Sequence, residues 1–178
     1  ASQKGHLSQM ADYWKESPPI LREFLNYHES ILSHSAQTVD EYFLDLRGFF
    51  RYLKMTRNPD LADVPFQEIS ILDVDLDFVS KTQLSEIYGF LTFLTGGGAF
   101  GKAESTTRAR KCASIRSFYN YLCVHARVMT ADPTQALNNP KMRKSLPRYL
   151  SLTESLQLLE AVSGPNELRD YCILTIFL

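Results

Sequence analysis

Apolar residues recur every three or four positions over much of the chain, which is the spacing of amphipathic α-helices. A first stretch begins behind Pro18 and Pro19, which suit a helix start, and a second, more regular one ends at Asn58-Pro59. Their apolar positions are Ile20, Leu21, Phe24, Leu25, Ile31 and Leu32 in the first stretch and Val39, Tyr42, Phe43, Leu46, Phe49, Phe50 and Leu53 in the second. We predict two helices, the second opened by a capping box of Thr38 and Glu41.

Two more helices are predicted after residues 59–80, a segment that is rich in Asp, lacks a sustained apolar period and is typical of a loop with short helical turns. The third helix is closed by the glycines at 96–98, and Ser105 can cap the fourth. Their apolar faces are Leu84, Ile87, Tyr88, Leu91 and Leu94, and Cys112, Ile115, Phe118, Tyr119 and Leu122. The expected fold class is therefore all-α, with a four-helix-type bundle over residues 18–131.

The pattern changes beyond residue 131. Asp132-Pro133 and Asn139-Pro140 interrupt the helical period, and the residues that follow are basic and lack apolar periodicity, as in a linker. The expected organisation is an amino-terminal extension at 1–17, a helical domain at 18–131, a linker at 132–150 and the start of a second domain at 151–178.

The last part of the chain carries two further helix signals. Ser151 and Glu154 form a capping box before an apolar stretch, and a final helix begins after Pro165. That final helix reaches Leu178 without a polar cap, a glycine or a basic last turn. We therefore expect more protein to follow.

Positive charge is concentrated in one segment, although the whole chain has a net charge of −1. Residues 1–101 carry a net −6, residues 102–148 a net +8 and residues 149–178 a net −3. Uneven charge also arises by chance in helical proteins, but a basic segment suits a nucleic-acid partner.

Two polar stripes at helical spacing accompany this charge. In the predicted fourth helix Thr106, Arg110, Ser114, Ser117 and Tyr121 share one side, whose side chains suit phosphate and base-edge contacts. In the second helix Arg47, Arg51 and Lys54 form another stripe, while His34, Ser35 and Thr38 lie at its amino terminus, where backbone N–H groups attract phosphate. Either stripe alone is equally well explained as a solvated face. Together with a basic linker, they favour DNA binding.

Other functional classes receive little support. Gly96–Gly101 reads GGGAFG before Lys102, which approaches phosphate-loop and dinucleotide patterns, but Ala103 stands where a phosphate loop needs Ser or Thr. A glycine connector between helices is the favoured interpretation. The scattered histidines form no metal motif, and the run Asp73, Asp75 and Asp77 suits loop or helix-cap chemistry, so we expect no cofactor or metal. Three cysteines without CxxC spacing, no signal peptide and no long apolar run indicate a cytoplasmic protein with no membrane partner.

The segment TRARKCASIRSFYNYL, residues 107–122, with the later NPKMRKSLPRYLSLTESLQLLEAV and LRDYCILTIFL, resembles the Xer-like branch of the tyrosine recombinases. This resemblance implies a core-binding domain related to the SAM-like domains of phage integrases, a basic linker and a catalytic domain, which together clamp DNA. In that family a tyrosine attacks a DNA phosphodiester to form a 3′-phosphotyrosyl intermediate. The family's catalytic motifs would lie beyond Leu178, so residues 1–178 are expected to bind DNA and to be inactive alone.

The resemblance and the stripes together give the predicted DNA contacts. They are Ser35, Thr38, Arg47, Arg51, Thr106, Arg110, Lys111, Arg116, Lys141, Arg143 and Lys144. The expected partners are a double-stranded DNA recombination site and, for the full-length protein, other recombinase protomers in a synaptic tetramer. The alternative is a non-enzymatic helical module that binds DNA or protein.

Overall fold

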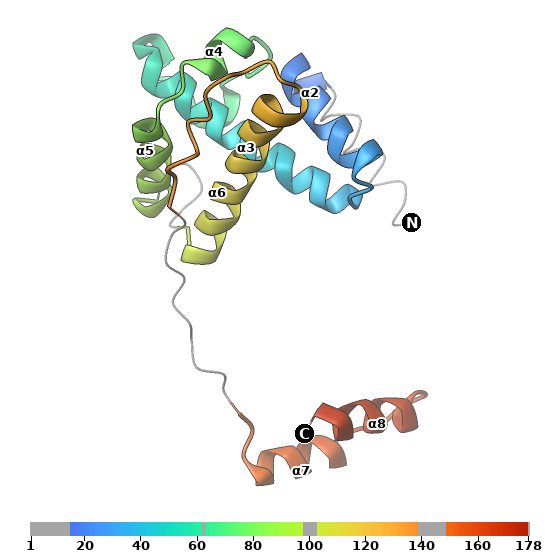
Figure 1. Cartoon of the computed structure of the whole chain (residues 1–178). Coiled ribbons are helices and arrows are strands. Elements are labelled where there is room, and N and C mark those ends of the chain that lie inside the picture. Colours follow the sequence, from blue (N-terminus) through green and yellow to red (C-terminus); the bar gives the residue numbers. More distant parts are fainter. Residues whose placement is uncertain (1–14, 62, 98–102, 139–148, 178) are drawn as a thin grey trace. The chain divides into compact units, whose positions relative to one another are not determined.

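The computed structural model describes residues 15–61, 63–97, 103–138 and 149–177, and all regular secondary structure in these ranges is helical (Figure 1). The predicted all-α fold class is confirmed. The chain divides into two compact units, Ala1–Met142 and Arg143–Leu178.

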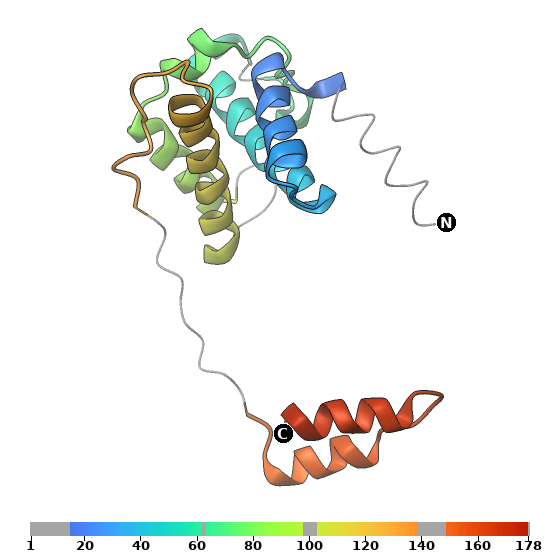
Figure 2. The same cartoon turned by 45° about the vertical axis from the view of Figure 1, so that its right-hand side comes forward.

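In the first unit α3 (Ala36–Arg57) runs through the middle, and α2 (Pro19–Asn26), α5 (Leu84–Thr95) and α6 (Ser105–Asn120) pack against it (Figures 1 and 2). Short elements connect them: the π-helical turns η1 (Tyr27–Ile31) and η4 (Tyr121–His125), the 3-10 turns η2 (Pro59–Leu61) and η3 (Phe66–Glu68), and α4 (Leu76–Ser80). The predicted loop with short helical turns at 59–80 is thus confirmed.

Aromatic side chains from four helices form the centre of the core. Phe24, Phe49, Phe50, Phe90 and Phe118 are all at most 1% exposed, and their rings meet in edge-on or tilted pairs, with centroids 5.4 Å apart for Phe50 and Phe118. Such pairs stabilise beyond the apolar area that they bury. The core is therefore the joint product of the predicted apolar stripes of α2, α3, α5 and α6.

The start of α3 differs from the predicted capping box. Ser35, not Thr38, is the N-cap: its backbone is extended, and its Oγ accepts a hydrogen bond from the Thr38 amide at 3.3 Å. The helix therefore begins one turn earlier than predicted, because a serine with an extended backbone satisfies a free amide of the first turn.

The end of the first predicted helix was also wrong. Ile31 and Leu32 are 69% and 43% exposed, although their spacing predicted core positions. From Tyr27 onward the hydrogen bonding changes to a π turn, in which the Leu32 amide donates to the Tyr27 carbonyl at 3.1 Å. This wider turn moves the following residues off the apolar side of the helix.

The predicted ends of the other helices are closer to the structure. α5 ends at its C-cap Gly96, followed by Gly97 with φ of 104°, which a glycine adopts without strain. For α6 the N-cap is Glu104, and Ser105 is the first helical residue instead of the cap. The rest of the glycine segment, residues 98–101, and Lys102 lie outside the described residues.

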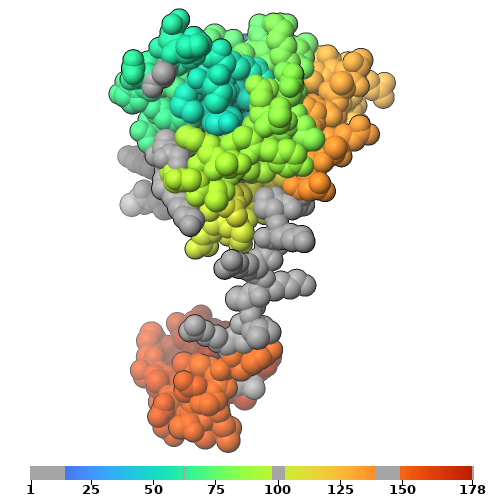
Figure 3. Space-filling view, turned by 90° about the vertical axis from the view of Figure 1, so that its left-hand side faces the viewer, coloured from blue at the N-terminus to red at the C-terminus, as the bar shows by residue number. Residues whose placement is uncertain are grey.

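Figure 3 shows a face of the first unit on which the connection from α3 to α5 lies beside α5 itself, with residues 130–138 next to them. Asp75 caps α4 by accepting from the Phe78 amide at 2.8 Å, while Asp73 pairs with Lys54 and Asp77 with Lys81. The prediction of loop and cap chemistry for these three aspartates is confirmed. Buried Tyr119 of α6 donates its hydroxyl to the Val79 carbonyl at 3.1 Å and so ties α4 to the core.

The second unit contains α7 (Leu152–Glu160) and α8 (Glu167–Phe177), which pack against each other. The predicted capping box is present: Ser151 Oγ accepts from the Glu154 amide, and the Glu154 carboxylate accepts from the Ser151 amide at 2.8 Å. Among the described helices of both units, none combines the length and the apolar character needed to cross a membrane.

Candidate nucleic-acid interface

α6 carries the candidate interface on its solvent side. Thr106, Arg110, Ala113 and Asn120 are exposed and follow one another at spacings of four, three and seven residues, so they share one side of the helix. Arg and Asn are the side chains that most often form paired hydrogen bonds with base edges in the DNA major groove. This exposed stripe overlaps the predicted one in only two residues, Thr106 and Arg110.

The other three predicted positions differ in exposure: Ser114 is buried, and Ser117 and Tyr121 are partly exposed. Ser114 is 4% exposed, and Ser117 hydrogen-bonds through Oγ to Nε2 of the buried His28 at 3.2 Å. The Tyr121 ring packs on Tyr27 with centroids 5.1 Å apart. Ser114 is therefore too buried to contact DNA, because its hydroxyl donates to Asp45, whereas DNA contacts by Ser117 and Tyr121 stay predictions.

A buried carboxylate on α3 holds the basic residues of α6. Asp45 is fully buried, and it accepts from Arg110 Nη1, Lys111 Nζ and Ser114 Oγ, each at 2.8 Å. A buried charge is tolerated only when it is paired and its lone pairs are hydrogen-bonded. Asp45 therefore fixes α6 to α3 at the amino-terminal half of the exposed stripe.

Arg110 and Lys111 differ in what they present to solvent. The Lys111 side chain is 14% exposed, whereas the Arg110 side chain is 42% exposed and also lies 3.4 Å from Oε2 of Glu41. Lys111 thus serves mainly to neutralise Asp45. Arg110 remains accessible to a ligand.

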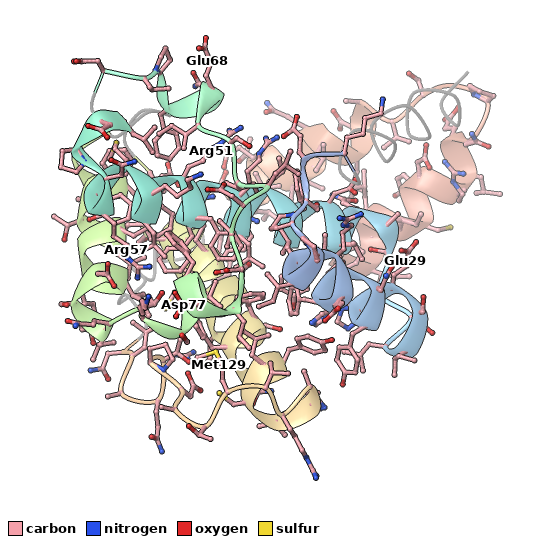
Figure 4. All side chains as sticks on the ribbon, turned by 90° about the horizontal axis from the view of Figure 1, so that it is seen from above. Glu29, Arg51, Arg57, Glu68, Asp77 and Met129 are labelled. Atoms are coloured by element: carbon pink, nitrogen blue, oxygen red, sulfur yellow. The ribbon has the colours of Figure 1, made fainter. Side chains whose placement is uncertain are left out.

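The basic stripe of α3 lies on the opposite side of that helix from Asp45 and faces other parts of the fold. Arg47 pairs with Glu16 at 2.7 Å, and the Lys54 ammonium donates to the Ser70 carbonyl at 2.8 Å. Arg51 is 9% exposed, its Nε donates to the Ile69 carbonyl at 2.9 Å, and burial lowers the pKa of its guanidinium (Figure 4). Positions 47, 51 and 54 therefore point away from α6, and the two predicted stripes lie on different sides of the first unit.

The other predicted contacts are partly in place. Ser35 and Thr38 lie at the start of α3, and Thr38 is one turn before Glu41 on the same side of the helix. Arg116 donates through Nη2 to the Leu137 carbonyl at 2.7 Å, so it anchors the segment that leads into the linker. Lys141, Arg143 and Lys144 lie outside the described residues.

Sequence reasoning missed Glu41, Asp45, Ala113 and Asn120. Ala113 and Asn120 could have been found, because they continue the spacing from Arg110. The role of Asp45 had no local signal, since its partner Arg110 is 65 residues away. In the part of the chain that the structure describes, no group of His, Cys, Asp and Glu side chains is arranged to hold a metal ion.

Comparison with known proteins identifies relatives over nearly the whole chain. It is 45% identical over 161 residues to tyrosine recombinase XerC of Caldanaerobacter subterraneus subsp. tengcongensis, covering 90% of this chain and 45% of that protein. It is 31% identical over 160 residues to XerC of Myxococcus xanthus, covering 89% and 45%. It is 29% identical over 159 residues to tyrosine recombinase XerD of Listeria monocytogenes serotype 4b, covering 88% and 46%.

The chain is therefore homologous to the tyrosine recombinases. Within that class it matches the Xer-like proteins and corresponds to their amino-terminal segment, which confirms the predicted resemblance. The chain spans about half the length of the curated relatives that it matches. No protein-family model and no solved structure matches it.

Proposed function

We propose that this chain binds double-stranded DNA as the amino-terminal part of a site-specific tyrosine recombinase. The observation that carries the proposal is the similarity to tyrosine recombinases along 90% of the chain. The proposed full-length protein cuts and rejoins DNA through a 3′-phosphotyrosyl intermediate, together with other protomers in a synaptic tetramer. Residues 1–178 alone would bind without cutting.

The proposed contact surface is the exposed stripe of α6 with the start of α3 beside it. Arg110 would contact phosphate or a base edge, and Thr106 and Asn120 would hydrogen-bond on either side of it along the helix. The methyl side chain of Ala113 between them leaves room for close approach. Ser35 and Thr38 would contact the DNA backbone, and Arg47 would lie outside this surface, as would the buried Arg51.

The linker would extend this surface. Lys141, Arg143 and Lys144 are three of the ten Lys and Arg residues of residues 102–148, and they would contact the DNA backbone. The proposed division remains residues 18–131 for DNA binding, 132–150 for the linker and 151–178 for the start of the catalytic domain. Arg116 would act indirectly, by holding the start of the linker through Leu137.

An electrophoretic mobility shift over a salt series tests DNA binding. The probe is a 30-base-pair duplex of mixed sequence, and the logarithm of the binding constant should fall with the logarithm of salt by about 0.9 per phosphate neutralised. A slope near −3 or steeper is expected if several phosphates are contacted. Failure of the whole chain to shift this duplex at low salt would refute the proposal.

A pair of single variants tests the assignment to α6. Arg110→Ala should weaken binding about tenfold and reduce the salt slope by about 0.9. Lys81→Ala is the control, because it removes one exposed cation at the end of α4, where it pairs with the exposed carboxylate of Asp77. Equal effects of both variants would exclude α6 from the interface. Lys111 is left intact, since it is needed to neutralise the buried Asp45.

A further inference from the structure

We infer that Asp45 is a positioning residue for Arg110 and that Glu41 is the built-in anion which a DNA phosphate replaces. This inference rests on the proposed DNA binding by α6 and adds to it. It concerns one cation between two carboxylates, one fully buried and one 48% exposed.

The buried carboxylate provides a fixed reference point. Asp45 and Lys111 neutralise each other inside the fold, and Ser114 fills a further acceptor position. Because Lys111 already neutralises the single negative charge of Asp45, the positive charge of Arg110 is not needed for that purpose. Asp45 fixes one edge of the Arg110 fork at 2.8 Å, and the positive charge of that fork is directed towards solvent.

The geometry of the fork leaves donors for a ligand. Arg110 uses the same nitrogen, Nη1, for both Asp45 and Glu41, so neither carboxylate occupies Nε or Nη2. A guanidinium carries five N–H donors in a rigid plane, and phosphate accepts from two of them at once. An arginine already held at one edge loses less side-chain freedom when it binds.

Glu41 is suited to displacement. Its contact with Arg110 is long, at 3.4 Å, and both side chains are more than 40% exposed, so solvent and salt screen the pair. A phosphate that binds the free donors of Arg110 from the solvent side would repel the nearby Glu41 carboxylate and replace it as the anion paired with Arg110. Glu41 therefore disfavours binding of any polyanion whose charged groups cannot hydrogen-bond directly with Arg110.

If Asp45 does not position Arg110, the expected effect of Asp45→Asn on DNA affinity is the opposite of the effect that our inference predicts. Asp45→Asn preserves size and raises the net charge by one, so general electrostatics predicts tighter binding to DNA. Loss of Arg110 positioning predicts weaker binding and a salt slope reduced by about 0.9, in spite of the added positive charge. The sign of the change separates the two explanations.

The experiment compares four variants of the whole chain on the 30-base-pair duplex, with circular dichroism melts as the check on folding. Arg110→Lys keeps the charge but removes the fork, and binding should weaken about fivefold. Glu41→Gln should tighten binding about fivefold. Glu68→Gln, an exposed acid on η3 with the same charge change, should tighten it less than twofold (Figure 4). Asp45→Asn should weaken it.

Each outcome decides for or against the inference. Wild-type affinity in Arg110→Lys would overturn the positioning of Arg110, and equal effects of Glu41→Gln and Glu68→Gln would overturn the role of Glu41. If Asp45→Asn fails to fold, those two comparisons decide, because both use exposed residues. Two other results would instead refute the proposed function. They are that the wild-type chain does not bind the duplex, or that the Arg110→Ala variant binds it with wild-type affinity.

Discussion

The guanidinium of Arg57 and the carboxylate of Glu86 form a two-pronged ion pair, with Nε to Oε1 at 2.7 Å and Nη2 to Oε2 at 2.8 Å. Arg57 is the last residue of α3, and Glu86 lies in the first turn of α5, where it also accepts from the Gln83 amide at 2.8 Å. Arg57 Nη1 donates in addition to the Phe78 carbonyl at 2.7 Å. Arg57 and Glu86 therefore join the end of α3 to α4 and to the start of α5.

Replacing Glu86 by Gln should reduce the free energy of unfolding by about 1–3 kcal/mol at pH 7, since a half-buried arginine loses its anion, while a glutamine can still accept from the Gln83 amide. Urea denaturation measures the change. Glu68→Gln serves as the control and should shift it by less than about 0.5 kcal/mol.

The same pair predicts acid sensitivity. Hydrogen bonding from Arg57 lowers the pKa of the Glu86 carboxyl below 4.5, so the folded state binds this proton less tightly than the unfolded state. The contribution of Glu86 is present above about pH 4.5 and is lost as the pH falls through its folded pKa. Glu86→Gln should flatten this part of the stability curve, and an unchanged acid limb would contradict the assignment.

His28 predicts a second pH dependence at higher pH. It is 4% exposed, its Nδ1 lies 3.1 Å from Nδ1 of His34, and burial, with repulsion from His34 and His125, lowers its pKa from 6.5 to about 4. The unfolded state therefore binds this proton first, and the free energy of unfolding should fall as the pH drops from about 6.5 towards 4. The loss is at most about 3 kcal/mol, at about 1.4 kcal/mol per pKa unit.

Urea denaturation between pH 7 and pH 4.5 measures this effect in a range above that of Glu86. His28→Gln removes the titrating ring and should reduce the slope of stability against pH in that range. An equally steep slope in the variant would assign the effect to another group.

Gly89 predicts an unusual pair of mutational effects. A Cβ at this position of α5 would lie 2.5 Å from the Tyr52 hydroxyl and 3.6 Å from the nearest ring carbon, and the Tyr52 ring packs against Phe90 and Phe93. Gly89→Ala should therefore destabilise the wild type by about 1 kcal/mol or more through overpacking. In a Tyr52→Phe background the clash is removed, and the same change should stabilise α5 by up to about 1 kcal/mol.

A double-mutant cycle in thermal or urea denaturation tests this sign reversal. Additive effects of Gly89→Ala and Tyr52→Phe would show that the two positions do not meet.

Much of the secondary structure followed from the sequence alone, because helices depend on interactions between residues three or four positions apart. The apolar period of residues 39–53 predicted the interior of α3, and Ser151 with Glu154 predicted the start of α7. Helix ends were less predictable. The π turn begins at Tyr27, whose ring packs against Tyr121 and His125, nearly a hundred residues away, and no local pattern reveals it.

In the candidate interface, too, some features could be predicted from the sequence and others only from the tertiary structure. Concentration of basic residues in α6 was evident from the sequence, and so was the family that they resemble. Only the tertiary structure decided which cations face outward: Arg51 is buried against Ile69, Lys111 neutralises Asp45, and Arg110 remains exposed. The physical reason is that exposure and charge pairing depend on partners brought together by folding, whereas periodicity depends only on neighbours along the chain.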